Sequence, residues 1–428
     1  MIDIELIRKT PELVKENIKK KFQDSKLSLV DEVIELDKEN RELKQKGDDL
    51  RASRKTKSAE IGGFMKNKEI EKANLMKQEV AKINKEIEET EAKQQLLDEK
   101  IKKIMMTIPN IIDSSVPIGK DDSENVENQK YGENKVPSYE IPYHADILYS
   151  LGGLDKESAG RTSGNGFYYL MGNPARLVTA MINYARDYMI NKNFTYCIPP
   201  FMIRSDVVNG VMSFAEMNAM MYKIEGEDLF LIGTSEHSMI GKFKDTILKP
   251  TELPITMTSY SPCFRKEVGA HGLEERGIYR VHQFEKQEMI VICTPEESME
   301  WYNKMWSYTV EIFRNLNIPV RTLECCSGDL ADLKVKSCDV EAWSPRQQKY
   351  FEVGSCSTLG DAQSRRLAIR VKGENGNYYP HTLNNTVLAS TRALIAFLEN
   401  NYNEDGSITI PEALRPYMGG KDKIEKVK

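Results

Sequence analysis

Two short segments in the second half of the sequence carry charged and aromatic residues at every second position. The segments are 262–267 and 280–288, and a period of two places such residues on one face of a β-strand. The residues that share this face are Arg265, Glu267, Arg280, Phe284, Lys286 and Glu288. Arginine can clamp a phosphate and phenylalanine can stack on a base. The pattern alone leaves open a nucleotide site or an exposed sheet face with cross-strand ion pairs.

The segment 269–277 between these two strands is polar and punctuated by glycine, as expected for a loop over a ligand. The sequence has no P-loop, no dinucleotide-binding glycine motif and no H-E-x-x-H. Its histidines show no paired metal spacing, and the adjacent Cys325 and Cys326 with Cys338 make a poor chelate. We therefore expect no zinc site.

Positioning these strands requires a folded domain, and the second half of the chain has the pattern of one. Strand-like runs such as 228–232 and 289–293 alternate with helical stretches over 176–192, 295–316 and 387–400. This alternation indicates an α+β fold on an antiparallel sheet. The preceding segment, 113–142, is polar with few apolar anchors, and we expect a linker that could carry a short strand.

Apolar residues in the first part of the chain recur with a seven-residue period. Two runs flank a break at Gly62 and Gly63, which predicts an antiparallel helical hairpin, and the second run would span about 50 Å at 1.5 Å per residue. The first run comprises Leu29, Val33, Leu36, Leu43 and Leu50, and the second comprises Ala73, Met76, Val80, Ile83, Ile87, Thr90, Gln94, Leu97, Ile101 and Ile104. A dimerisation coiled coil and a solvated spacer remain open.

A basic cluster lies near the distal end of the expected hairpin. Its members are Arg51, Arg54, Lys55 and Lys57, with no acidic residue among them. Such a cluster suits phosphate contacts, although a short basic run is more often a solvated helix face.

Composition restricts the class of protein. The 428 residues are 40% hydrophobic with a formal net charge of −5, which predicts two or three domains and no global attraction to nucleic acid. Seven scattered cysteines indicate a reducing compartment. The start resembles no targeting peptide, and no apolar stretch is as long as a membrane span. We expect a cytoplasmic protein with no membrane partner.

Several segments, taken in order, resemble the seryl-tRNA synthetase family of class II aminoacyl-tRNA synthetases. The two strand segments are similar to its motif 2, and Pro199-Pro200 to motif 1. The other matching segments are Gly233-Thr234-Ser235-Glu236-His237, Phe351-Glu352-Val353-Gly354-Ser355-Cys356-Ser357, the following 363–370, His381 to Arg392 as motif 3, and Pro411 to Pro416. Together with the helical arm, the resemblance covers nearly the whole chain. It implies a tRNA-binding arm over 1–112, a linker over 113–142 and a catalytic domain over 143–428.

The resemblance also implies substrates and partners. The expected reaction activates L-serine with ATP and Mg²⁺ and transfers serine to tRNA(Ser), and to tRNA(Sec) where present, in a homodimer. Arg265, Arg392 and Glu352 would be catalytic. The ATP site would comprise Arg265, Glu267, Arg280, Val281, Phe284, Glu352, Ser355 and Arg392, with Mg²⁺ on Glu352. The serine site would comprise Thr234, Glu236, Arg265, Glu288 and Thr386. The basic residues Arg51, Arg54, Lys55 and Lys57 would contact tRNA.

The sequence departs from the family pattern at two places. Many members read N-G-S-G where this chain has Asn384-Asn385-Thr386-Val387, and A-E-V-P where it has Ser235-Glu236-His237-Ser238. These departures bear on the contacts to serine. Two rival functions remain: an amino-acid:carrier-protein ligase, which would lack the long arm, and an inactive RNA-binding paralogue, which would have lost motif residues.

Overall fold

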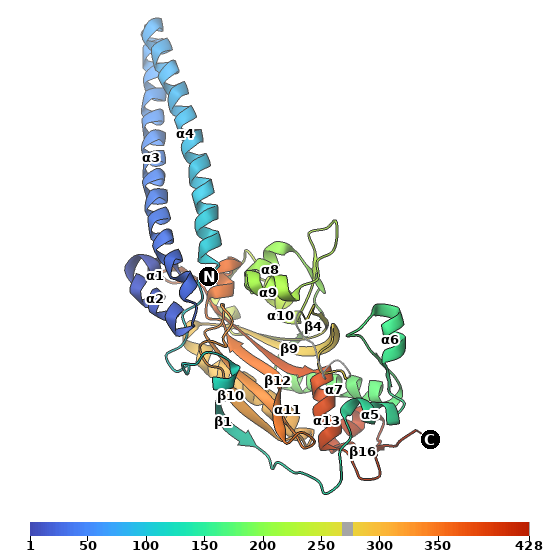
Figure 1. Ribbon diagram of the computed structural model, residues 1–428. Coiled ribbons are helices and arrows are strands. Elements are labelled where there is room, and N and C mark those ends of the chain that lie inside the picture. Colours follow the sequence, from blue (N-terminus) through green and yellow to red (C-terminus); the bar gives the residue numbers. More distant parts are fainter. Residues whose placement is uncertain (268–276, 428) are drawn as a thin grey trace. The chain divides into compact units, whose positions relative to one another are not determined.

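A computed structural model describes residues 1–267 and 277–427 of the chain (Figure 1). The chain forms two compact units, Ile2–Pro109 and a larger unit of Met1 with Asn110–Lys428. The loop expected over 269–277 lies outside the described residues except for Gly277. The finer division into 1–112, 113–142 and 143–428 stays a proposal.

The smaller unit is entirely helical in its described elements. Its helices are α1 Ile4–Lys9, α2 Pro11–Lys20, α3 Leu27–Lys66 and α4 Ile70–Met105. The Asp3 side chain caps α1 by accepting a hydrogen bond from the Glu5 amide, and Pro11 starts α2, where a missing N–H costs nothing. The long helices α3 and α4 lie side by side (Figure 1). The predicted hairpin is confirmed.

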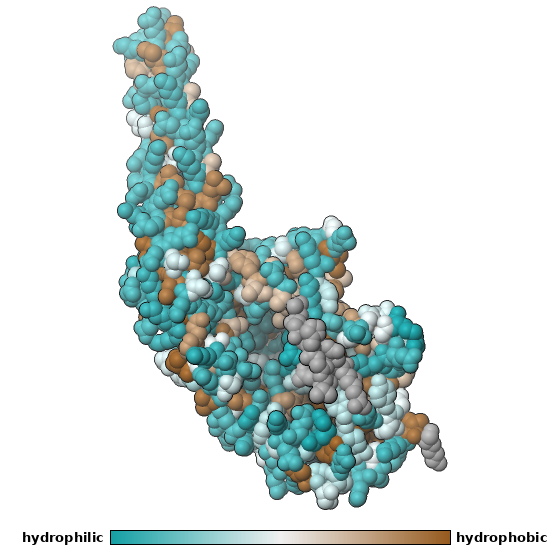
Figure 2. Space-filling model, in the orientation of Figure 1, coloured by the Kyte–Doolittle hydropathy of each residue, from teal (hydrophilic) through white to brown (hydrophobic). Residues whose placement is uncertain are grey.

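The seven-residue repeat forms the seam between α3 and α4. Val33, Ala73, Ile87 and Ile101 are buried, and the other residues of the two predicted runs are buried or half-buried. The remaining surface of the long helices is mostly hydrophilic, with scattered hydrophobic spots (Figure 2). A narrow seam therefore holds the hairpin, as expected for a coiled coil.

The predicted helix break at Gly62 and Gly63 is wrong. Both glycines lie inside α3, and the chain reverses at Asn67 to Glu69, where Lys68 adopts a left-handed conformation with φ 59°. A glycine in a helix interior costs only about 1 kcal/mol relative to alanine. Packing against α4 offsets this cost, because each added turn extends the seam.

The larger unit is built on an eight-stranded sheet within the described residues. Its strand order is β1-β10-β11-β12-β15-β9-β8-β4, and every neighbouring pair is antiparallel except β4 and β8. The strands are β1 Val126–Tyr131, β4 Thr195–Cys197, β8 Ile255–Phe264, β9 Gln283–Cys293, β10 Val320–Glu324, β11 Lys336–Ser344, β12 Lys349–Thr358 and β15 His381–Ala389. The predicted α+β class is confirmed, with one parallel edge pair.

Both faces of this sheet are covered, as the sequence of β9 illustrates. Met289, Val291 and Cys293 join the hydrophobic core formed with α7 Gly172–Asn191, α11 Ser298–Asn315 and α13 Ser390–Asn400. Ile290 and Ile292 join a second core, formed with α8 Ser205–Val211 and α10 Ser235–Gly241. Successive side chains point to opposite faces, so a strand buried on both sides has a continuous apolar run.

The predicted helices of this unit differ from the observed ones mainly at their ends. The stretch 387–400 is helical only from Ser390, because Leu388 and Ala389 still pair with β9. In 228–232, only β6 Phe230–Leu231 is a strand. The remaining elements are α5 His144–Ser150, β2 Leu154–Asp155, α6 Lys156–Ser163, β3 Tyr169–Leu170, β5 Met202–Ile203, α9 Phe214–Met220, β7 Ile247–Leu248, α12 Ala362–Arg366, β13 Arg370–Gly373, β14 Gly376–Tyr378, β16 Ile408–Thr409 and β17 Lys423–Ile424.

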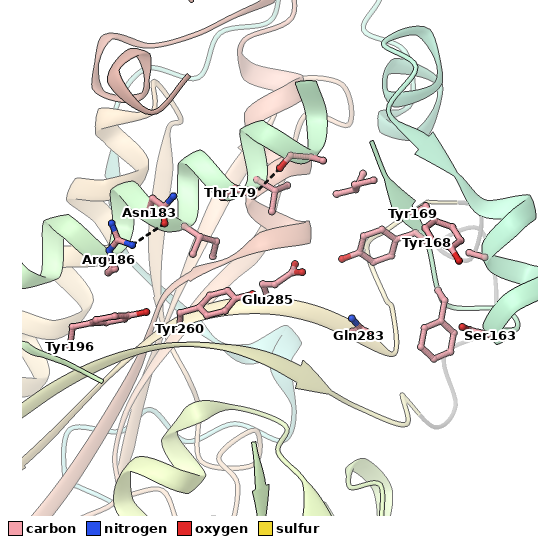
Figure 3. A pocket seen from close by; sticks show the side chains of 16 residues that line it. Ser163, Tyr168, Tyr169, Thr179, Asn183, Arg186, Tyr196, Tyr260, Gln283 and Glu285 are labelled. Atoms are coloured by element: carbon pink, nitrogen blue, oxygen red, sulfur yellow. Dashed lines mark hydrogen bonds between the residues drawn. The ribbon is translucent and has the colours of Figure 1, made fainter. Parts of the chain in front are cut away.

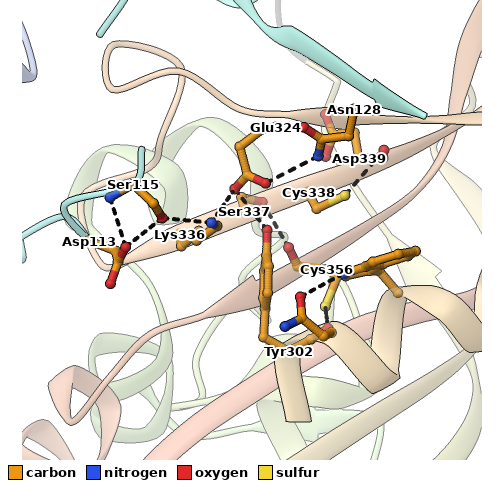
Figure 4. A network of polar contacts seen from close by, with 12 residues as sticks. Asp113, Ser115, Asn128, Tyr302, Glu324, Lys336, Ser337, Cys338, Asp339 and Cys356 are labelled. Atoms are coloured by element: carbon orange, nitrogen blue, oxygen red, sulfur yellow. Dashed lines mark hydrogen bonds and ion pairs between the residues drawn. The ribbon is translucent and has the colours of Figure 1, made fainter. Parts of the chain in front are cut away.

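The segment 113–142, expected as a linker, supplies edge strand β1 to the main sheet. A polar network holds its beginning against β10, β11 and α11 (Figure 4). Lys336 donates to the Ser115 hydroxyl at 2.8 Å and lies 3.5 Å from Glu324, which also accepts from Tyr302 at 3.0 Å. The segment is thus part of the larger unit rather than a free tether.

No helix within 1–267 and 277–427 combines the length and the apolar character that crossing a bilayer requires.

Candidate functional site

A pocket in the larger unit gathers most of the residues that the sequence singled out. It opens where β9, β12 and β15 meet the start of α13. Its lining residues are Arg265, Glu267, Tyr279, Arg280, Val281, Phe284, Lys286, Glu352, Val353, Gly354, Thr386, Ala389, Thr391 and Arg392. The pairing of the two predicted strands, β8 with β9, creates this face: Cys263 lies opposite Phe284, and Ser261 opposite Lys286.

Arg265, Glu267 and Arg280 reach the pocket in a way that strand alternation did not predict. The ladder ends at Phe264 and resumes at Gln283, so all three lie beyond the paired strands, and Glu267 has φ 46°. The Arg265 amide still donates to the His282 carbonyl at 2.9 Å. This bond keeps the two chain segments adjacent and brings the same side chains to the pocket.

Three arginines make the pocket strongly cationic. Arg265 donates to the Gly233 carbonyl at 3.2 Å, and its guanidinium lies 5.4 Å from the centre of the Phe284 ring. Arg392 lies 4.8 Å from the Tyr279 ring centre and binds Glu352 at 2.8 Å. Arg280 lies 3.7 Å from Glu267. Guanidinium groups that line a pocket can bind a phosphate through two parallel hydrogen bonds.

Glu352 and Glu267 are the acidic residues that line this pocket, and Glu352 is bound to Arg392. Burial opposes its ionisation, but Arg392, Lys334 and Arg265 lower the pKa of the carboxyl below its usual value. On the neighbouring strand, burial and the Glu352 charge raise the pKa of Asp339 to about 7, against the effects of Lys334 and a hydrogen bond from Ser355. Ser355 does not line the pocket but lies opposite Asp339 in the ladder. These oxygens are the ligand type that Mg²⁺ prefers.

A buried polar cluster adjoins the arginine pocket through Lys286. Glu288, which is 1% exposed, forms an ion pair with Lys286 and accepts a hydrogen bond from the Thr234 hydroxyl at 3.2 Å. Thr386 lies opposite Glu288 in the β15–β9 ladder. A carboxylate, two hydroxyls and an ammonium group thus converge on one small space, which suits a small polar ligand.

Glu236 adds a second carboxyl to this cluster. It is in the first turn of α10, which the Thr234 side chain caps. Burial and the Glu288 charge raise the pKa of Glu236 to about 7, while Gln363, Lys286 and Lys334 lower it. Burial lowers the pKa of His237 to about 3, so the neighbouring imidazole is neutral and does not compete as a cation. The Glu236 carboxylate is therefore suited to an incoming ammonium group.

Sequence reasoning did not assign several residues that belong to the site. Lys286 was left open between a site residue and a surface charge, and it is 6% exposed at the centre of the cluster. The sequence pattern assigns no role to Tyr279 or Asp339. Alternation along β11 could have identified Asp339, because it places the Asp339 and Glu341 side chains on one face of the strand. Asp339 lies opposite Ser355 in the ladder. Gln363 lies in a segment that resembles the family, but the resemblance implies no role for it.

One group of side chains in the described residues has a geometry that could hold a metal ion, namely Cys325, Asp329 and Asp339. Asp329 accepts a hydrogen bond from Asn125 at 2.9 Å, and the charge of Asp339 raises the pKa of Lys334 against the effect of burial. The Lys334 ammonium group therefore already supplies positive charge there.

A second cavity, of about 540 Å³, lies on the other side of β9 (Figure 3). Gln283 and Glu285 line it, whereas Phe284 and Lys286 line the arginine pocket, as alternation along a strand requires. The other walls come from α7, from Tyr196 and Tyr260, and from Phe167 to Leu170. Its aromatic lining contains no cluster of arginines.

The basic cluster of the helical unit is largely engaged within that unit. Arg51 binds Glu91 and Asp48, each at 2.8 Å, and its guanidinium covers Gly47 at the seam. Lys57 pairs with Glu79 across the seam, and Arg54 donates to Asn84 at 3.4 Å. Arg54 and Lys55 are exposed. Part of the cluster thus stabilises the hairpin, and the exposed pair remains available to a partner.

Family models match both units. Residues 1–112 match the seryl-tRNA synthetase N-terminal domain, and residues 221–401 match the tRNA synthetase class II core domain (G, H, P, S and T). The Serine--tRNA ligase of Thermococcus sibiricus is 42% identical over 100% of this chain and 99% of its own. That of Methanoculleus marisnigri is 39% identical over 99% of this chain and all of its own.

Solved structures give the same result. Seryl-tRNA synthetase from Pyrococcus horikoshii complexed with ATP has a TM-score of 0.93 and 38% identity, with 100% of both chains covered. The cytoplasmic Serine-tRNA ligase of Naegleria fowleri in complex with AMP has a TM-score of 0.88 and 31% identity, covering 100% of this chain and 99% of its own.

Proposed function

Because this chain belongs to the seryl-tRNA synthetase family, we propose that it activates L-serine with ATP and transfers the serine to tRNA(Ser). The observation that carries this proposal is one site in which three arginines adjoin the buried carboxyl of Glu288 and the half-buried carboxyl of Glu236. Cations suit a polyphosphate, and these carboxyls suit the ammonium and hydroxyl groups of serine. The same site would serve tRNA(Sec) where that tRNA is present.

The first step joins the serine carboxylate to the α-phosphorus of ATP and releases pyrophosphate. The nucleophile is already ionised, so the step needs no general base. Negative charge accumulates around the α-phosphorus, and fixed cations stabilise such charge effectively. We assign the α-phosphate and the serine carboxylate to Arg265, a further phosphate contact to Arg280, and the terminal phosphate to Arg392, which also lies closest to Glu352.

The nucleoside end of ATP would lie between aromatic and apolar groups. Phe284 would stack on adenine, with Val281 beside it, and Glu267 would contact ATP or the tRNA end. Arg265 now lies near the Phe284 ring, so the same guanidinium could bind phosphate beside a stacked base.

Mg²⁺ fits the oxygen-rich side of the pocket. Glu352 would hold it together with Ser355, and Asp339 is close enough to Glu352 for its pKa to be affected. A bound Mg²⁺ neutralises charge on the polyphosphate. The Arg392 contact holds the Glu352 carboxylate ionised and oriented for this role.

Serine would lie against the cluster around Glu288. Thr234 and Glu236 would hold its ammonium group, and Glu288, with Thr386 opposite, would accept a hydrogen bond from its hydroxyl. Glu288 already accepts from Thr234 and binds Lys286. Its orientation is therefore set before the ligand arrives, which reduces the entropy cost of binding.

The helical unit would bind tRNA. The exposed Arg54 and Lys55 are the strongest candidates of the basic cluster, because Arg51 and Lys57 pair with acidic side chains of the hairpin. The long hairpin argues against the carrier-protein ligase, which would lack it. The convergence of Arg265, Glu288, Glu352 and Arg392 argues against an inactive paralogue.

We also propose a homodimer in the cytoplasm. Exposed apolar side chains lie near the proline pair in the chain: Ile198 is 71% exposed, Met202 48% and Ile190 43%. Tyr196, which precedes the proline pair in the chain, lines the aromatic cavity beside α7 (Figure 3). Exposed apolar patches of this kind mark interaction surfaces. The free thiols among the described residues suit a reducing compartment.

Two assays test the proposal. Serine-dependent exchange of pyrophosphate into ATP measures the first step alone, and charging of tRNA(Ser) measures both steps. Exchange without charging would favour the carrier-protein ligase, and neither reaction would favour the inactive paralogue.

A further inference from the structure

The short helix α12 lies behind the serine cluster and carries a buried glutamine that the proposed function does not use. Gln363 is 0% exposed. Its Nε2 donates to Glu236 Oε1 at 2.8 Å and to the Val211 carbonyl at 3.2 Å. Its Oε1 accepts from the Thr382 hydroxyl at 2.6 Å. One amide therefore joins α8, α10 and β15, with both N–H donors used and its oxygen accepting a hydrogen bond.

The orientation of this amide is determined by its surroundings. Two acceptors, the Glu236 carboxylate and the Val211 carbonyl, face one end of the Gln363 side chain. In the flipped orientation the Gln363 oxygen would face the Glu236 carboxylate and the Val211 carbonyl. The two buried oxygen–oxygen contacts would then have no hydrogen between them. Thr382, also 0% exposed, then donates to the Gln363 oxygen. The N–H end must face Glu236.

We propose that Gln363 is a positioning residue for amino-acid recognition, which holds the Glu236 side chain ionised and aimed at the ammonium group of the substrate. This inference rests on the proposed role of Glu236. A permanent N–H donor favours the charged form of a carboxyl, because it can bind the carboxylate without giving up a proton. It also fixes which carboxylate oxygen stays free for the ligand.

The charged groups around Glu236 make such a donor necessary. Glu288 on β9 disfavours the Glu236 charge, Lys286 on β9 and Lys334 before β11 favour it, and burial disfavours it. Lys286 is already bound to Glu288, and His237 is held neutral. Gln363 therefore supplies the direct hydrogen bond that offsets burial of the Glu236 carboxylate.

The test compares two Gln363 variants across pH in pyrophosphate exchange. Gln363→Met removes the donor with little change of volume, and Gln363→Glu keeps the shape and the Thr382 bond but adds a like charge. Loss of a hydrogen bond to a charged group should raise the KM for serine roughly 10- to 100-fold near pH 7. The KM for ATP should stay unchanged. The pH below which kcat/KM for serine falls should be higher in both variants than in the wild type. The shift should be larger for Gln363→Glu.

Asn401→Leu is the matched control. Asn401 is a buried amide, 6% exposed, that donates to the Leu316 and Phe397 carbonyls away from the serine cluster. Its loss should lower thermal stability and leave the KM for serine and its pH profile unchanged. Gln363 variants that behave like this control would overturn the proposal. If Gln363→Met fails to fold, the near-isosteric Gln363→Glu decides by the same readouts.

Glu236→Gln separates this inference from the proposed function. If Glu236→Gln leaves serine use unchanged, the proposed ammonium site is wrong. If Glu236→Gln weakens serine use but both Gln363 variants keep wild-type KM and pH profile, the ammonium site stands and the positioning role fails.

Discussion

At the scale of single residues, the arginine pocket makes the most direct prediction. Arg265→Ala should reduce adenylate formation roughly 100- to 1000-fold, the usual effect of removing one electrostatic donor from a transition state. The protein should stay folded, because this guanidinium lines a pocket rather than a core. Pyrophosphate exchange and thermal unfolding measure the two effects. An Arg265→Ala variant with unchanged exchange would contradict the assignment.

The Glu288 carboxylate should decide between serine and alanine. A site built to hydrogen-bond a hydroxyl rejects a ligand that lacks it, because its buried polar groups are left unpaired. Threonine keeps the hydroxyl and is rejected only through one methyl group, which supplies about 1–3 kcal/mol. Alanine should therefore be rejected more strongly than threonine.

Glu288→Gln should reduce discrimination against alanine roughly tenfold or more, the scale of one charged hydrogen bond, and change discrimination against threonine less. Pyrophosphate exchange with the three amino acids measures both ratios. Full preference for serine over alanine in Glu288→Gln would mean that another group reads the hydroxyl. Because Lys286 pairs with Glu288, thermal unfolding of this variant must be measured alongside.

The pKa of Glu236, about 7 in the free protein, predicts a pH dependence. Ammonium binding needs the carboxylate, so kcat/KM for serine should fall up to tenfold per pH unit below about 7. The Glu236 pKa is higher in the folded protein than in the unfolded chain. The unliganded fold should therefore lose stability as the pH rises from the unfolded-state pKa through 7, because the charged form is unfavourable in the fold. Activity and unfolding profiles from pH 5.5 to 8.5 measure both trends, and Glu236→Gln should flatten the second.

At the scale of elements, the two units should separate in function. Deleting residues 29–104 removes most of α3 and α4 but no residue of the arginine pocket. Serine-dependent pyrophosphate exchange should stay largely intact, whereas tRNA charging should be lost. If the hairpin served only to hold the dimer together, the shortened protein would be a monomer. The hairpin would then contribute nothing to the affinity of the intact dimer for tRNA.

Within the hairpin, the ion pairs change which basic residues should matter. Arg54→Glu with Lys55→Glu should weaken tRNA binding and flatten its dependence on salt, because fewer phosphates are neutralised. The matched control exchanges Lys57 and Glu79, which preserves their cross-seam pair. Filter binding from low to high salt measures the slope. Equal losses in the double variant and in the exchanged pair would place the tRNA contact elsewhere.

At the scale of the whole molecule, the exposed region near Pro199 predicts the assembly. In analytical ultracentrifugation the protein should have about twice the chain mass of 48.9 kDa. Ile198→Asp should shift it toward a monomer, because a charge in an apolar interface is strongly unfavourable. Ile247→Asp, at a 52% exposed isoleucine of β7, is the control and should leave the mass unchanged. A monomeric wild-type protein would contradict the dimer.

The sequence by itself determined those features that repeat over short distances. The seven-residue period located the α3–α4 seam, and the period of two along β9 separated Phe284, Lys286 and Glu288 from the residues of the opposite face. Periodicity is a local property, since the same backbone geometry that spaces the side chains also sets the face on which they lie.

Only the tertiary structure decided which distant polar groups meet. Gln363 and Glu236 are 127 residues apart in the chain, and Arg51 and Glu91 are 40 apart. No periodic signal connects such pairs. A buried polar group must find a partner wherever the packing of helices and strands brings one within reach, and that packing depends on the whole core. For the same reason α3 continues through Gly62 and Gly63, because contacts with α4 outweigh the low helix propensity of glycine.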